Sequence, residues 1–246
     1  MRAAVYSGTR NLYPGMVTAA KSLTRNSNVE KIYFLIEDDE FPEKLPPHIE
    51  TINVSNQDYF PKNGANFRTC FTYMSLLRVC YTKLFPELDK ILQLDVDTVV
   101  VDDVSGLWDI DLDGKMYAAV EEINSTYKPF GPKYYNIGVA MFNLKQIRKE
   151  RADDHSIVYL NCTTTPYIDQ DAWNRFHRWA VDLPVRYNES IVTGYTEEPA
   201  IVHFAGFKDW QSANSRAPRR EYLKKYREMT WEEALNGKDS RLRTDV

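Results

Sequence analysis

The sequence is poor in cysteine and contains no long hydrophobic run. Cys70, Cys80 and Cys162 are an odd number without Cys-x-x-Cys spacing, which disfavours both a disulfide framework and a structural zinc site. No segment approaches the roughly 18 consecutive apolar residues of a membrane-spanning helix, and the apolar run at the N-terminus is too short for a signal peptide. We therefore expect a protein of a reducing compartment, with a cytoplasmic location.

A surplus of positive charge is absent as well. The 246 residues hold 31 Lys and Arg against 35 Asp and Glu, a net charge of −4, so no nucleic-acid partner is expected. With 43% hydrophobic residues, the chain can bury one substantial core. Basic residues gather after residue 212, where Tyr222, Leu223 and Tyr226 would support a basic amphipathic helix. Such a helix predicts a peripheral contact with an anionic membrane, on its inner face.

Short β-branched runs alternate with helical patterns, which predicts an α/β fold. Helices are expected around residues 16–23, with Pro14 in the first turn, and over residues 71–85, where apolar residues recur at helical spacing. The expected strands cover residues 3–7, 31–36, 49–54, 91–94, 98–101, 117–120 and 138–144.

Two carboxylates stand directly after one of these buried strands. Asp95 and Asp97 are separated by one residue, so strand alternation would point both side chains to the same face. Like charges this close repel each other, and a divalent cation would relieve the repulsion. Open α/β sheets bind ligands at the carboxyl ends of their strands, which favours a metal site over a solvated turn.

A second group of polar residues follows the apolar residues 200–202. The imidazole of His203 could join the two carboxylates on a metal such as Mn²⁺. Gly206 would let the backbone approach a phosphate closely, and Lys208 would supply a cation. A diphosphate leaving group needs these features.

Two further motifs allow more than one interpretation. Asp169, Gln170 and Asp171 would suit a helix start with Asp169 as the cap, or a site that reads sugar hydroxyls with planar amide and carboxylate groups. Arg78 on an otherwise apolar helix needs an anionic partner, which is either a core acid or the substrate.

In their order and spacing these motifs resemble glycosyltransferase family 8, the group that includes glycogenin and bacterial lipopolysaccharide galactosyl- and glucosyltransferases. The resemblance runs from Val5 to Trp210 and also includes Asn11, the Ala19–Leu23 segment and the Tyr135–Val139 segment. It implies a GT-A fold, a Rossmann-like nucleotide-binding mixed sheet flanked by helices. The catalytic domain would cover residues 1–211, with a donor-binding part over 1–105, an acceptor-binding part over 106–211, and a basic tail over 212–246.

The resemblance also implies an activity and a role for each motif. A glucose or galactose would move from a UDP-sugar to a glycan or glycolipid acceptor with retention of configuration, and Mn²⁺, or Mg²⁺ in its place, would stabilise the UDP leaving group. The residues implied are Asp95, Asp97 and His203 for the metal, Ser7, Thr9, Asn11, Arg78, Val96, Asn136, Gly206 and Lys208 for the donor, Tyr135 and Asp171 for the acceptor, and Gln170 and Asp169 for catalysis.

Gln170 would stabilise an oxocarbenium-like state during front-face attack by the acceptor, because an amide is a poor nucleophile; a covalent role for Asp169 is the alternative. Thr9 stands where many members carry an acidic residue that helps to hold uridine, which leaves the base preference open. A metal-dependent nucleotidyltransferase and a non-catalytic nucleotide-sugar-binding protein remain as alternatives, although no glycine-rich phosphate loop supports the former.

Overall fold

The chain is built around a mixed β-sheet. The computed structural model describes residues 1–207, 210–212 and 215–241. One sheet has seven strands in the order β3-β2-β1-β4-β7-β6-β8, and a second sheet pairs β5 with β9. The strands are β1 (Ala3–Ser7), β2 (Lys31–Ile36), β3 (Ile49–Asn53), β4 (Lys90–Leu94), β5 (Thr98–Val100), β6 (Tyr117–Glu121), β7 (Tyr135–Asn143), β8 (Ala180–Asp182) and β9 (Ile201–His203).

The first four strands of the large sheet run parallel, whereas β7 lies antiparallel between β4 and β6. Because β6 therefore points the same way as β4, the carboxyl ends of β1, β4 and β6 lie at one edge of the sheet. The predicted Rossmann-like mixed sheet is confirmed, and this edge is where such sheets bind ligands.

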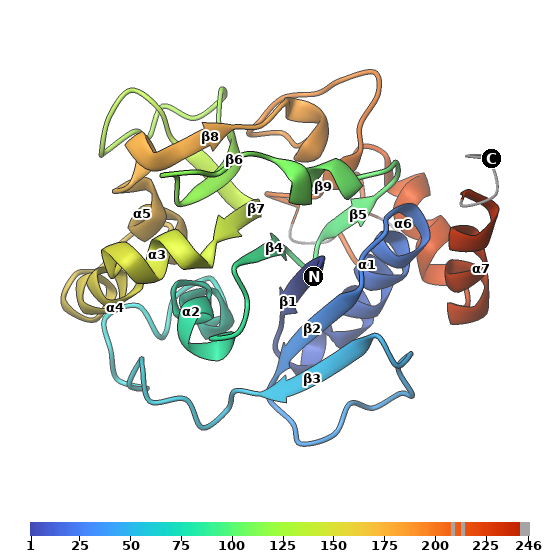
Figure 1. The fold of residues 1–246 in the computed structure, drawn as a ribbon, viewed down its shortest axis with the longest axis horizontal. Helices are drawn as coiled ribbons and strands as arrows, with labels where there is room; N and C mark the ends of the chain where they lie inside the picture. Colours follow the sequence, from blue (N-terminus) through green and yellow to red (C-terminus); the bar gives the residue numbers. More distant parts are fainter. Residues whose placement is uncertain (208–209, 213–214, 242–246) are drawn as a thin grey trace.

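Alternate residues of the central strands face two separate cores. Ala4 and Tyr6 pack on the side of α1 (Tyr13–Asn26), whose Pro14 stands in the first turn as expected, whereas Ala3 and Val5 pack on the opposite side. The opposite side is covered by η2 (Tyr73–Cys80), α2 (Tyr81–Leu84), α3 (Leu144–Glu150), α4 (Ala152–Cys162) and α5 (Ile168–Asn174). Figure 1 shows helices on both faces of the sheet. Four short 3₁₀ segments complete the connections: η1 (Arg10–Leu12), η3 (Ser105–Asp109), η4 (His177–Trp179) and η5 (Val185–Tyr187).

The expected helix over residues 71–85 differs from the prediction. Residues 73–80 form a 3₁₀ helix, and only residues 81–84 are α-helical. Apolar spacing over so short a segment does not distinguish three residues per turn from 3.6. Phe71 lies outside the helix and is 42% exposed.

The C-terminal helices belong to the folded body. The helices α6 (Arg220–Glu228) and α7 (Trp231–Arg241) lie beside α1, on the right in Figure 1. Leu223 and Tyr226 are buried against Val99, Val202 and Phe204. Residues 220–228 form the predicted basic helix, but its Leu223 and Tyr226 pack on the protein and are not available to a membrane. A contact of the exposed basic residues with an anionic membrane stays a prediction. Among the described residues, no helix has the length and hydropathy needed to cross a membrane.

We expect Leu223→Ala to lower the free energy of unfolding by about 2 to 5 kcal/mol, because it opens a cavity between α6 and the sheet. Lys224→Ala is the matched control, since the Lys224 side chain is exposed. Urea denaturation of both variants measures the difference. Equal stabilities would contradict the packing of α6 as described.

Candidate active site

The two carboxylates of the Asp95–Asp97 segment lie in a turn between the two sheets, not in a strand. The chain leaves the large sheet after Leu94 and enters the small one at Thr98, so residues 95–97 must change direction. The turn is tied at its start, because the amide of Asp95 donates to the carbonyl oxygen of Gly138 (2.7 Å). The hydroxyl of Thr98 donates to the Asp95 carbonyl (2.7 Å). The expectation of strand alternation is therefore wrong, although both carboxylates still meet at one point.

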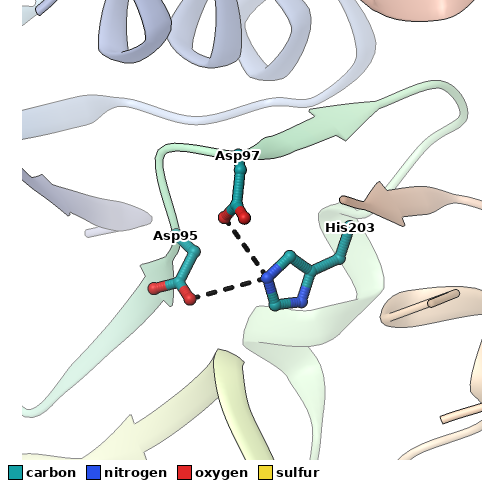
Figure 2. Close-up of side chains that lie close together, drawn as sticks. All are labelled: Asp95, Asp97 and His203. Atoms are coloured by element: carbon teal, nitrogen blue, oxygen red, sulfur yellow. Dashed lines mark ion pairs between the residues drawn. The ribbon is translucent and has the colours of Figure 1, made fainter. Parts of the chain in front are cut away.

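A β-ladder brings His203 to this turn. Strands β5 and β9 pair antiparallel with His203 opposite Thr98, and the amide of Phe204 donates to the carbonyl of Asp97 (2.9 Å). Nε2 of His203 consequently lies 3.5 Å from Oδ2 of Asp95 and 3.3 Å from Oδ1 of Asp97. Figure 2 shows the side chains of Asp95 and Asp97, which come from one turn, converging with that of His203 from β9.

This arrangement fits a divalent cation. Adjacent ligands of an octahedral ion bound at about 2.1 Å are separated by about 3 Å. The two distances from the His203 nitrogen are close to this value, and the three ligand atoms lie within 4.8 Å of one another. Two carboxylate oxygens and one imidazole nitrogen suit a first-row divalent metal. The three side chains therefore form a candidate metal centre.

The charges of this centre are interdependent. Burial by itself would lower the pKa of His203, but Asp97 and then Asp95 raise it above its ordinary value. Burial by itself would raise the pKa of Asp97, but His203 lowers it below the usual range. A metal would replace the proton of His203 as the cation that offsets these two carboxylates.

Arg78 joins the turn to α5. One terminal nitrogen of its guanidinium lies 2.5 Å from Oδ1 of Asp95, and the other lies 3.2 Å from Oδ2 of Asp169. Asp169 is 3% exposed, and burial raises its pKa to about 6 even though Arg78 opposes the shift. The anionic partners that Arg78 requires are thus two acids within the site, Asp95 and Asp169. The ion pair with Arg78 orients Asp95 so that its other carboxylate oxygen faces His203.

Gln170 is held by backbone and side chain together. Its Oε1 accepts from the amide of Ile137 (3.1 Å), and its Nε2 donates to Oε1 of Glu122 (3.0 Å). Glu122 also accepts from Nδ2 of Asn136 (2.8 Å). Sequence reasoning missed Glu122, which follows the apolar strand β6 just as Asp95 follows β4. An acid directly after a buried strand was the signal that could have identified it.

Gly138 and Asn188 were missed as well. A Cβ atom on Gly138 would lie 2.2 Å from Cε1 of His203 and 2.8 Å from Oδ2 of Asp95, so only glycine leaves room for the centre here. The fully buried Asn188 accepts from Nδ1 of His203 (2.9 Å). Because this contact joins segments brought together only by the fold, no sequence pattern indicated it.

Two predicted acceptor contacts are engaged elsewhere. Asp171 is fully buried and accepts from the hydroxyl of Tyr134 (2.6 Å) and the amide of Tyr167 (3.0 Å). The hydroxyl of Tyr135 donates to Asp182 (2.6 Å), and its side chain is buried. Both side chains are therefore bonded to other residues of the protein, and their contact with an acceptor stays a prediction. The N-cap of α5 is Tyr167, so the prediction of Asp169 as the cap is also wrong.

The residues expected on the nucleotide side lie around the same edge of the sheet. Ser7 ends β1, and the parallel pairing of Val5 with Gln93 places Ser7 level with Asp95. Thr9 donates to the side chain of Asn11 (2.7 Å), and both residues are accessible. The remaining expected donor contacts are Val96, half-buried in the turn, Gly206, whose positive φ of 83° favours glycine, and Lys208, which lies outside the described residues.

The amino-acid sequence is similar to a known protein family and to several known proteins. The sequence model of glycosyl transferase family 8 matches residues 4–214. The chain is 35% identical over 177 residues to Probable galacturonosyltransferase 9 of Arabidopsis thaliana. The aligned region covers 56% of this chain and 30% of that protein. It is 28% identical over 173 residues to General stress protein A of Bacillus subtilis. This alignment covers 55% of this chain and 58% of that protein. The chain thus spans less than two thirds of either relative.

Solved structures share the fold. The galactosyltransferase LgtC in complex with donor and acceptor sugar analogues superposes with a TM-score of 0.74 at 20% identity, covering 96% of this chain and 99% of that one. The glycosyltransferase GlyE of Streptococcus pneumoniae superposes with a TM-score of 0.72 at 24% identity. The superposition covers 98% of this chain and 64% of that one. The similarity confirms the predicted GT-A architecture.

We expect Gly138→Ala to weaken Mn²⁺ binding at least about tenfold, because the added methyl group must displace His203 or Asp95. Gly106→Ala is the control, since a Cβ atom there meets no neighbour within 4 Å. Electron paramagnetic resonance of free Mn²⁺ measures both affinities. Unchanged binding in Gly138→Ala would contradict the assigned position of the centre.

A second prediction concerns pH. Since the folded protein raises the pKa of Asp169 from 3.8 to about 6, the stability that this group contributes is complete below pH 3.8 and is lost as the pH rises through 6. We expect the stability of the wild type relative to Asp169→Asn to fall by up to about 3 kcal/mol between acidic and neutral pH.

Chemical denaturation in chelator across this pH range tests the prediction, with Asp109→Asn at an exposed aspartate as the baseline. A difference between wild type and Asp169→Asn that stays constant or grows with pH would contradict it.

Proposed function

The chain belongs to glycosyl transferase family 8, and on this premise we propose that it is a retaining hexosyltransferase that uses a UDP-sugar. The observation that carries the proposal is the convergence of Asp95, Asp97 and His203 at the carboxyl edge of the sheet, next to the Arg78–Asp169 pair. A sugar donor with a diphosphate leaving group needs a metal centre of this kind beside a polar site for the hexose. Glucose and galactose are the proposed hexoses.

Asp95, Asp97 and His203 would hold Mn²⁺, with Mg²⁺ as the alternative. Bound there, the ion would supply positive charge to stabilise the UDP leaving group. The protein prepares the centre by holding one oxygen of Asp95 on Arg78, which leaves the other directed at His203. Gly206 and Lys208 are proposed to bind the diphosphate beyond this centre.

Gln170 is proposed to act at the anomeric carbon. Its Oε1 accepts one bond from the amide of Ile137 and keeps a second lone pair with which to stabilise developing positive charge. Asp169 is less suited to covalent catalysis, because it is buried and its carboxylate is paired with Arg78. These contacts favour attack by the acceptor hydroxyl on the face from which UDP departs, which retains the configuration.

The nucleoside is proposed to lie over the end of β1. Ser7, Thr9 and Asn11 border that edge, and Val96 is proposed to contact the nucleoside from the turn after β4. Thr9 donates to the oxygen of the Asn11 amide, so the NH₂ group of Asn11 remains available to a base carbonyl. This arrangement is compatible with uracil, which presents carbonyl acceptors. Arg78 and Asn136 are proposed to border the donor sugar.

The acceptor is proposed to be a glycan or glycolipid. The side chains of Phe71 and Tyr167 are each 42% exposed, with ring centroids 6.4 Å apart, and Tyr167 stands just before the Asp169–Gln170 pair. Exposed aromatic rings beside a polar site provide an apolar surface for the face of a sugar ring. The names of the relatives favour galactose-type hexoses among the donors to be tested.

The proposal predicts that UDP raises the melting temperature only with Mn²⁺ present, and that GDP does not. UDP release should then follow with UDP-glucose, UDP-galactose or UDP-galacturonate. Asp97→Asn should lose this turnover while keeping its circular dichroism spectrum, because it removes one ligand of the centre. Proton NMR of the product measures whether the anomeric configuration is retained.

Other outcomes would identify the alternatives. Pyrophosphate release from UTP would indicate a nucleotidyltransferase. Tight binding of UDP-sugars without any UDP release, with a range of sugar acceptors, would indicate a binding protein. Full activity of Asp97→Asn would contradict the assignment of the metal centre.

A further inference from the structure

A continuous chain of hydrogen bonds connects His203 to Gln170 beneath the site. Nδ1 of His203 donates to Oδ1 of Asn188 (2.9 Å), and Nδ2 of Asn188 donates to Oδ1 of Asn136 (2.9 Å). Nδ2 of Asn136 and Nε2 of Gln170 both donate to Oε1 of Glu122, at 2.8 and 3.0 Å. The candidate metal centre and the proposed catalytic amide are therefore linked through three intervening side chains.

Two neighbouring backbone amides set the direction of every bond in this chain. The amide of Gly138 donates to Oδ1 of Asn136 (3.1 Å), and the amide of Ile137 donates to Oε1 of Gln170 (3.1 Å). A backbone N–H can only donate, so each side-chain amide must turn its oxygen toward β7 and its NH₂ group toward Glu122.

The direction of these hydrogen bonds also determines which nitrogen of the His203 imidazole carries a proton. Because Oδ1 of Asn136 is an acceptor, Asn188 must present its NH₂ group to Asn136 and its oxygen to His203. The Nδ1 atom of His203 must then carry the proton. Once the ring is neutral, the lone pair lies on Nε2, the nitrogen that faces Asp95 and Asp97.

The position of Asn188 is fixed by its surroundings. Its side chain is fully buried. The next residue, Glu189, accepts from the amide of His203 (2.8 Å) and donates to the carbonyl of Ile201 (2.9 Å), so the segment is bonded to β9 on both sides. These backbone bonds hold the Asn188 segment in register with His203.

We propose that Asn188 is a positioning residue of the metal centre, which holds His203 in the tautomer and orientation that present Nε2 to the metal. The inference rests on the proposed metal-dependent function. A hydrogen bond of this kind to a ligating imidazole typically contributes 10- to 100-fold to metal affinity, which is roughly the size of the expected effect.

Three variants distinguish an effect of Asn188 on the metal centre from an effect on protein stability alone. Asn188→Leu removes the acceptor and should raise the dissociation constant for Mn²⁺ by about 10- to 100-fold. Asn188→Asp keeps an acceptor toward Nδ1 but places an oxygen against Oδ1 of Asn136, so it should lose stability and keep Mn²⁺ affinity within a few-fold of wild type. Asn66→Leu removes another buried amide, whose NH₂ group bonds the carbonyls of Leu160 and Thr163, and should lose stability alone.

The measurement is electron paramagnetic resonance of free Mn²⁺ in titrations of the full chain, with and without UDP, alongside the melting temperature of each variant. Selective loss of Mn²⁺ affinity in Asn188→Leu, with recovery in Asn188→Asp, is the result expected. Wild-type affinity in Asn188→Leu, or losses in all three variants that follow their melting temperatures, would overturn the inference alone. A wild type that binds no Mn²⁺ in either condition would overturn both the inference and the proposed metal-dependent function.

Discussion

The site depends on the close approach of several carboxylates, which lie within a few ångströms of one another in buried and half-buried positions. Asp95, Asp97 and Asp169 carry like charges that repel each other, and burial makes the charged forms of Asp97 and Asp169 more costly. Among the described residues, Arg78 and His203 are the cationic side chains that form ion pairs with these acids. Arg78 is permanently charged, whereas His203 can exchange its proton for a metal bond. The surrounding fold therefore keeps one fixed cation and one exchangeable position in the same cluster.

Strand β7 supplies the backbone groups that hold this cluster in place. The carbonyl of Gly138 accepts from the amide of Asp95, and the amides of Ile137 and Gly138 fix Gln170 and Asn136. A strand buried between β4 and β6 has little freedom to move, so its peptide groups provide a rigid reference for side chains from distant segments. The absence of a side chain at Gly138 is part of the same arrangement, because it leaves the space in which His203 meets Asp95.

Much of the fold could be predicted because its strands are short, apolar and separated by clear breaks. The runs at residues 3–7 and 31–36 are strands with the expected bounds, and a helix with Pro14 in its first turn lies between them as expected. The 3₁₀ geometry of residues 73–80 could not be predicted, since it depends on packing under the sheet more than on local propensity. The packing of α6 could not be predicted for a related reason: its apolar residues look available to a membrane until the surface that covers them is known.

The sequence by itself determined the mixed α/β class, the family and the identity of the candidate metal ligands, because short motifs directly after apolar strands carry that information locally. Only the tertiary structure decided which partners these residues have. Asp171 accepts from the hydroxyl of Tyr134, Arg78 bridges two acids, and Asn188 accepts from Nδ1 of His203. The physical reason is that a polar side chain can bind substrate, metal or protein with the same atoms. Its actual partner is settled by the distances that the folded chain imposes between segments far apart in sequence.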